Sequence, residues 1–115
     1  MSEQPIKKFL IELSDHLDYA EKVYFHYIEN KNKFVYAKVL FNINEEIYHL
    51  VKLNIVICPD EVKQDCLDLI FHLDIWLTIW KNEVAQKNPS WSDEFIFQNE
   101  INFPKQSVKR LLDLI

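Results

Sequence analysis

Hydrophobic residues between Pro5 and Glu29 recur every three or four positions, the spacing of one face of an α-helix. Pro5 suits a first helical turn, and charged residues occupy most of the other positions. The run ends at Asn30-Lys31-Asn32, where asparagine can take the left-handed conformation that glycine usually takes after a helix. The pattern predicts a long amphipathic helix over residues 5–29.

Residues 33–58 carry two patterns at once. Apolar side chains alternate with other residues over Val35–Ile43 and over Ile47–Ile57, and many of them are β-branched or aromatic, which favours strands. Helical spacing also fits the segment, with Asn42 and Glu45 three apart as in a capping box. We predict an antiparallel β-hairpin with strands at about 33–43 and 47–57, and a helix is the alternative.

The second half of the chain predicts two further helices. Pro59 followed by two acids is typical of a helix start, and the apolar spacing continues to about Gln86. Leu69, Leu73 and Trp76 are expected to be almost completely buried. After a turn at residues 88–90, short strands are expected at 95–97 and 101–103, and Pro104 starts a final helix.

These elements predict a single α+β domain over residues 1–115. The long N-terminal and central helices pack on the hairpin, and the short C-terminal helix closes the core. An all-α bundle of four to five helices is the alternative.

Composition excludes several classes of function. The 115 residues contain no glycine, so the phosphate-binding loop, the dinucleotide fingerprint and the nucleophile elbow are all absent. The formal net charge is −5 and Arg110 is the only arginine, which argues against nucleic-acid and anionic-membrane binding. Neither a secretory leader nor a membrane span is predicted, because the most apolar stretch, Leu67–Trp80, contains two aspartates and a histidine. We therefore expect a cytoplasmic protein.

Carboxylate and histidine pairs could in principle bind a metal ion. Glu46 and His49 have the Glu-x-x-His spacing of bundle metal sites, Asp68 and His72 are four apart, and His16 borders the first apolar stripe. A metal-binding helical protein using these five residues is an alternative function, and it requires residues 44–58 to be helical. We expect ordinary surface pairs and no metal or other cofactor.

Catalytic signatures are missing from the sequence. No serine has a neighbouring histidine, and no cation lies next to Cys58 or Cys66 to favour a thiolate. Both cysteines fall among apolar residues, where a free thiol behaves as a small hydrophobe, and a structural disulfide or a metal-binding pair is the alternative. We do not expect an enzyme.

Two apolar surfaces are candidates for binding. The segment Trp91–Phe103 has four large aromatics, three acids and no basic residue, a composition that would attract a basic protein. Its candidate contact residues are Trp91, Asp93, Glu94, Phe95, Phe97 and Glu100; the alternative is that the aromatics cap the core. Phe71, Ile75 and Ile79 form a second apolar side of the central helix, suited to a homodimer that encloses a small ligand.

The function predicted is therefore a non-catalytic, acidic protein-binding module. In general character the chain resembles small, compact orphan bacterial proteins, including toxin-neutralising immunity proteins. This is a similarity of type that no residue motif carries, so it assigns a role to no particular residue.

Overall fold

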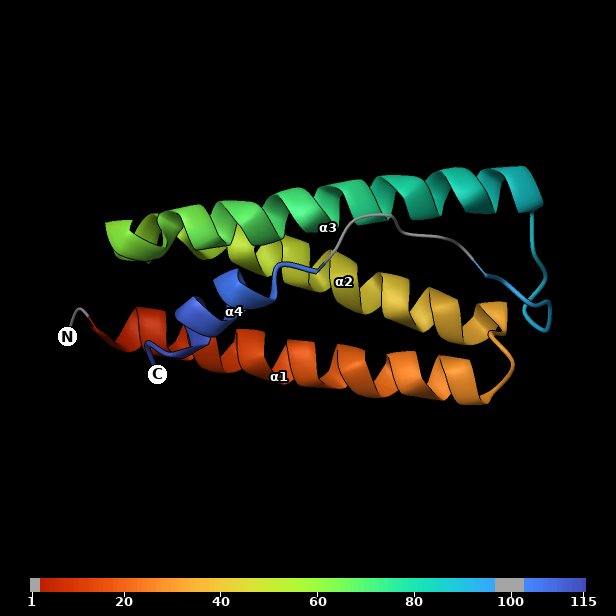
Figure 1. Cartoon of the computed structure of the whole chain (residues 1–115), viewed down its shortest axis with the longest axis horizontal. Coiled ribbons are helices and arrows are strands. Elements are labelled where there is room, and N and C mark those ends of the chain that lie inside the picture. The colour runs from red at the N-terminus through yellow and green to blue at the C-terminus, as the bar shows by residue number, and fades with distance from the viewer. Residues whose placement is uncertain (1–2, 97–102) are drawn as a thin grey trace.

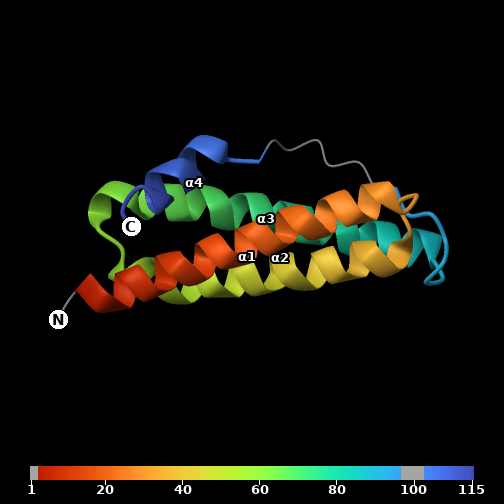
Figure 2. The ribbon, with the colours of Figure 1, turned by 90° about the horizontal axis from the view of Figure 1, so that it is seen from below.

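Four α-helices and one short 3-10 helix build the fold in residues 3–96 and 103–115, the parts of the chain that the computed structural model describes. They are α1 (Glu3–Glu29), α2 (Phe34–Asn54), η1 (Ile55–Ile57), α3 (Asp60–Lys87) and α4 (Lys105–Leu112). The three long helices run antiparallel, each to the one before, along a body of 49 × 21 × 21 Å (Figure 1). Helix α4 packs on α3 and α1 at the end that holds both chain termini (Figure 2).

The predicted β-hairpin at about 33–43 and 47–57 is wrong. Residues 34–54 form the continuous helix α2, and η1 completes the turn into α3. The α+β class is therefore replaced by the all-α alternative. Asn42 lies inside α2 rather than at a helix start, so the predicted capping box does not form.

The hairpin prediction failed because some apolar positions fit both the strand period and the helix period. Alternating apolar residues share one face of a strand, and every second one of them, four residues apart, also shares one face of a helix. Ala37 and Phe41 fit both patterns, whereas Val35 and Val39 of the same run are exposed. The side chains buried in α2 follow the helical spacing: Phe34, Ala37, Leu40, Phe41, Ile43, Ile47 and Val51. Without glycine, a tight hairpin turn at Asn44-Glu45-Glu46 is unfavourable, and packing between α1 and α3 decides for the helix.

The other predicted helices are confirmed within a few residues. α1 and α3 cover the expected ranges, Pro59 stands at the N-cap of α3, and α4 begins directly after Pro104. Leu69, Leu73 and Trp76 are buried as expected. For the strands expected at 95–97 and 101–103, residues 97, 101 and 102 lie outside the described part of the chain. The described part contains one isolated bridge, between Lys33 and Glu94, in place of a sheet.

The core has two halves of different composition. At the end with the termini it consists mainly of aliphatic side chains from α1, α2, α3 and α4, among them Leu13, Ile47 and Leu69. At the opposite end it is aromatic, with Phe34, Phe41, Trp76, Trp80 and Phe95 among its members. Among the described residues, no helix combines the length and the apolar character needed to cross a membrane.

Candidate functional site

The segment that follows α3 fastens the aromatic end of the bundle. The backbone N–H groups of Phe34 and Val35, at the start of α2, donate to the carbonyl oxygens of Asp93 and Trp91 at 2.8 and 3.0 Å. The N–H of Phe95 donates to the Asn32 carbonyl at 2.7 Å. Because α2 has no side-chain N-cap, these carbonyls satisfy donors that would otherwise lack a partner. The segment therefore stabilises the start of α2.

Of the contact residues predicted in this segment, Phe95 is buried and Trp91 is exposed. Phe95 is fully buried against Phe34 and Trp80, and its carbonyl accepts a hydrogen bond from the Tyr27 hydroxyl. Trp91 is 60% exposed although its ring stacks on Phe34 at 5.4 Å. Phe95 therefore serves the core, which was the alternative expected for these aromatics.

The acidic members of the segment lie next to lysines. Asp93 and Glu94 are exposed, and Asp93 Oδ2 accepts the N–H of Ser90 at 2.7 Å. The bridge between Lys33 and Glu94 brings the loop after α1, which carries Lys31 and Lys33, next to this segment, although the two are about sixty residues apart in the sequence. The surface at this end is therefore of mixed charge. Phe97 and Glu100 lie outside the described residues.

The five candidate metal ligands fall in separate places. His16 Nε2 lies 3.4 Å from a Glu46 carboxylate oxygen, across α1 and α2, and its Nδ1 is bonded to the Glu12 carbonyl. His49 is exposed on α2. Asp68 and His72 lie on α3, where Asp68 faces Ser107 of α4 and His72 packs against Phe103, just before α4. In residues 3–96 and 103–115, no group of three or more His, Cys, Asp or Glu side chains is arranged to hold a metal ion.

A polar seam joins α3 to α4. Arg110 donates from Nε and a terminal nitrogen to Asp65 Oδ1, both at 2.8 Å, and the Ser107 hydroxyl donates to Asp68 Oδ2 at 2.9 Å. Hydrogen bonding to Asp65 raises the pKa of the Arg110 guanidinium above its ordinary value. These contacts position α4 on α3.

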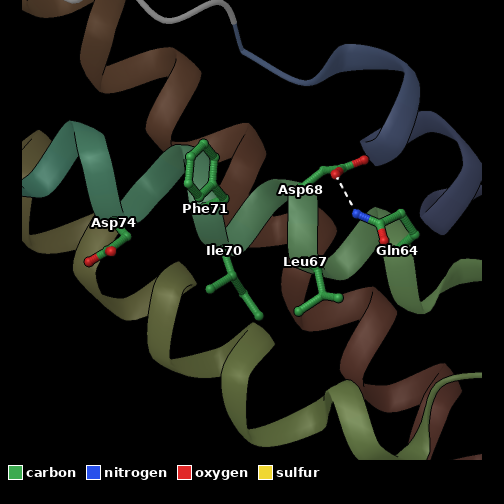
Figure 3. A pocket seen from close by; sticks show the side chains of 6 residues that line it. All are labelled: Gln64, Leu67, Asp68, Ile70, Phe71 and Asp74. Carbon is green, nitrogen blue, oxygen red and sulfur yellow. Dashed lines mark hydrogen bonds between the residues drawn. The ribbon is translucent and has the colours of Figure 1, made fainter.

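The outer face of α3 has open apolar side chains, of which the sequence had marked Phe71. Phe71 is 65% exposed and Leu67 is 48% exposed, and a shallow depression beside them is lined also by Gln64, Asp68, Ile70 and Asp74 (Figure 3). Leu67 and Ile70 point to the side of α3 that adjoins α2, whereas Asp68 turns to α4 (Figure 3). Of the second predicted surface, Phe71 is therefore open, and Ile75 and Ile79 are half-buried.

Sequence reasoning missed a further group of exposed apolar residues. Tyr24, Phe25 and Ile28 on α1 are each about half exposed, although Tyr24 and Ile28 match the spacing of the buried stripe. Helix α4 is too short to cover this part of α1, so one side of the stripe stays open. Phe25 was a usable signal, because it is a large apolar residue among the charged positions of the helix.

Comparisons of the chain with protein-family models, with curated proteins and with solved structures find no match.

Proposed function

We propose that this chain is a non-catalytic, cytoplasmic protein-binding module whose docking surface is the outer face of α3. The α3 face is defined here as Gln64, Leu67, Asp68, Phe71 and Asp74, with Ile70 at its base. Its occupant is a segment of another protein that presents one or two apolar side chains flanked by lysine or arginine. The observation that carries the proposal is the exposure of Phe71 beside Leu67, with the carboxylates of Asp68 and Asp74 bordering the depression.

Burial of apolar area supplies the affinity in this proposal. Phe71 and Leu67 are one turn apart on α3, and Leu67 turns toward α2, so a partner segment would cover both by lying across the helix (Figure 3). Aromatic side chains at the centre of an interface contribute most to binding when they become fully desolvated. Phe71 is the exposed aromatic of α3, which makes it the expected centre of the contact.

Charge selects the kind of partner. From Asp60 to Trp80, α3 carries five acids, of which Asp65 is buried and paired with Arg110, and one basic residue, Lys63, which lies 3.3 Å from Asp60. Asp68 and Asp74 border the depression itself. Such a field favours encounter with basic segments and disfavours acidic ones.

The test is capture of an identified partner by the natural chain and by three matched variants. Phe71→Ser removes the proposed centre, Phe25→Ser removes an aromatic of similar exposure on α1, and Trp91→Ser tests the end surface. We expect Phe71→Ser alone to weaken binding, by about tenfold or more, with unchanged far-UV circular dichroism and urea midpoint. A partner that binds Phe71→Ser as tightly as the natural chain contradicts the α3 face.

Two other results would assign the contact differently. If Trp91→Ser alone weakens capture, the contact lies at the aromatic end. If native mass spectrometry shows a multiple of 13.9 kDa that Phe71→Glu returns to a monomer, the α3 face joins two copies of this chain.

A further inference from the structure

The two cysteines of the chain meet where η1 passes into α3. Cys58 follows η1 directly, and Cys66 lies in the second turn of α3. Their Sγ atoms are 3.6 Å apart, and both residues are buried, Cys58 at 4% exposure and Cys66 at 0%. They are the only cysteines among the 115 residues, and both are free thiols.

The two sulfur atoms are in non-bonded contact. A disulfide requires about 2.05 Å between the sulfur atoms, so the two atoms need to approach by about 1.5 Å. Cys66 is held by the helix, whereas Cys58 lies between two helices, next to Pro59. Formation of the bond requires rotation of the Cys58 side chain and a shift of the turn. We propose that Cys58 and Cys66 form a reversible disulfide that locks the corner between α2 and α3.

The reaction partner is a small-molecule disulfide of the glutathione class. The Cys58 thiol loses its proton and attacks one sulfur of that disulfide, whose S–S bond breaks and releases one thiol. The Cys66 thiol then loses its proton and attacks the Cys58 sulfur, which releases the second thiol. Two protein thiols are oxidised by two electrons, one small disulfide is reduced to two thiols, and the two protons pass to the released thiolates.

The order of attack follows from exposure. The neighbours of Cys58 are open to solvent, with Ile57 at 41% exposure and Val56 at 75%. Cys66 is enclosed, and burial raises the pKa of its thiol to about 12. Burial raises the pKa of the Cys58 thiol as well, and its Sγ contacts the Asn54 carbonyl at 3.4 Å. Because both thiols are buried, the oxidant reaches Cys58 only when the η1 turn opens transiently. We therefore expect slow oxidation, which requires prolonged exposure to the oxidant.

The experiment uses the folded natural chain with oxidised glutathione, followed by intact mass spectrometry. We expect a product lighter by about 2 Da, the mass of two hydrogens, together with a higher urea midpoint that returns to its starting value after reduction. Cys58→Ser should remain largely unmodified, because Cys66 is enclosed, and Cys66→Ala should stop at the mixed disulfide with glutathione.

Three results overturn the proposal. They are an unchanged mass of the natural chain, a natural chain that stops at the mixed disulfide, and an oxidised product whose urea midpoint is not raised. The proposal is independent of the α3 face, since Phe71 is not part of the cysteine contact. Phe71→Ser should therefore oxidise at the same rate as the natural chain, whatever its effect on binding.

Discussion

Single residues with left-handed backbone show how this chain makes turns without glycine. Lys31, Asn32 and Asn88 have positive φ values of 62°, 57° and 44°. Asparagine tolerates this conformation, because its short polar side chain can bond locally, whereas lysine has no such compensation. The left-handed position at Lys31 therefore stores strain in the turn between α1 and α2.

Replacing Lys31 with glycine should relieve that strain. We expect Lys31→Gly to raise the free energy of unfolding by about 0.5–1 kcal/mol, because glycine adopts positive φ without a Cβ clash. The matched control is Lys33→Gly, where φ is −68° and glycine only adds freedom to the unfolded chain. Urea denaturation of the three proteins measures the difference. A Lys31→Gly protein less stable than the natural chain contradicts the strain at this position.

The buried thiols predict how stability depends on pH. In reducing solution the pKa of Cys66 is 9.0 in the unfolded chain and about 12 in the folded one, because burial penalises the thiolate. The folded state holds this proton more tightly, so the stabilisation is complete below pH 9 and is lost as the pH rises from 9 to about 12.

Cys66→Ala should therefore lose less stability than the natural chain over this interval. The difference between the two proteins should change by up to about 1.4 kcal/mol for each pH unit. Urea denaturation at about pH 8 and about pH 10.5, with reductant present, gives the comparison. Parallel pH profiles of the two proteins would exclude Cys66 as the source.

At the scale of elements, α4 is held by a few strong contacts. It has only eight residues, too few for a stable isolated helix, so its structure depends on docking. Leu111 is fully buried in the core, and Arg110 reaches the carboxylate of Asp65. The two partners of this ion pair differ in environment, since the Asp65 side chain is 4% exposed and that of Arg110 is 57% exposed.

This difference predicts unequal effects of removing either charge. Arg110→Met should destabilise the protein more than Asp65→Asn, because it leaves a buried carboxylate without its cation, whereas a bare Arg110 stays hydrated. Methionine keeps much of the apolar stem, so the comparison isolates the charge. Urea midpoints of both variants test the order, and equal or reversed midpoints contradict it.

At the scale of the whole molecule, charge is distributed unevenly along the rod. The first half of α3 is acidic and is partly balanced by three basic residues of the adjoining α4, while Lys31, Lys33 and Lys87 belong to the opposite, aromatic end. Under the proposed function, this distribution would steer a basic partner toward the acidic end before any contact forms.

We expect salt to change mainly the association rate of the partner, and substitution of Phe71 to change mainly its dissociation rate. Raising the salt concentration from about 0.05 to about 0.5 M should slow association with the basic partner severalfold and change its dissociation much less. Phe71→Ser should show the converse, with faster dissociation and nearly unchanged association. Surface plasmon resonance separates the two rates. Association that does not respond to salt contradicts the electrostatic part of the proposal.

The open surfaces were only partly predictable. The apolar surplus on α3 marked Phe71 in the sequence, but burial of Ile75, Ile79 and Phe95 depends on segments far away in the chain. Exposure of Tyr24 and Ile28 likewise depends on how far α4 extends along α1. A hydrophobic pattern states which side of a helix is apolar, and the neighbours decide how much of that side is covered.

The sequence by itself determined α1, α3 and α4, because their apolar residues follow one period and proline or asparagine marks their ends. Only the tertiary structure decided residues 34–57, where alternation by two also satisfied a helix and packing between α1 and α3 selected it. The cysteine contact and the Arg110–Asp65 pair were also decided there. Local periodicity reports only neighbours along the chain, whereas these contacts arise when helices pack side by side.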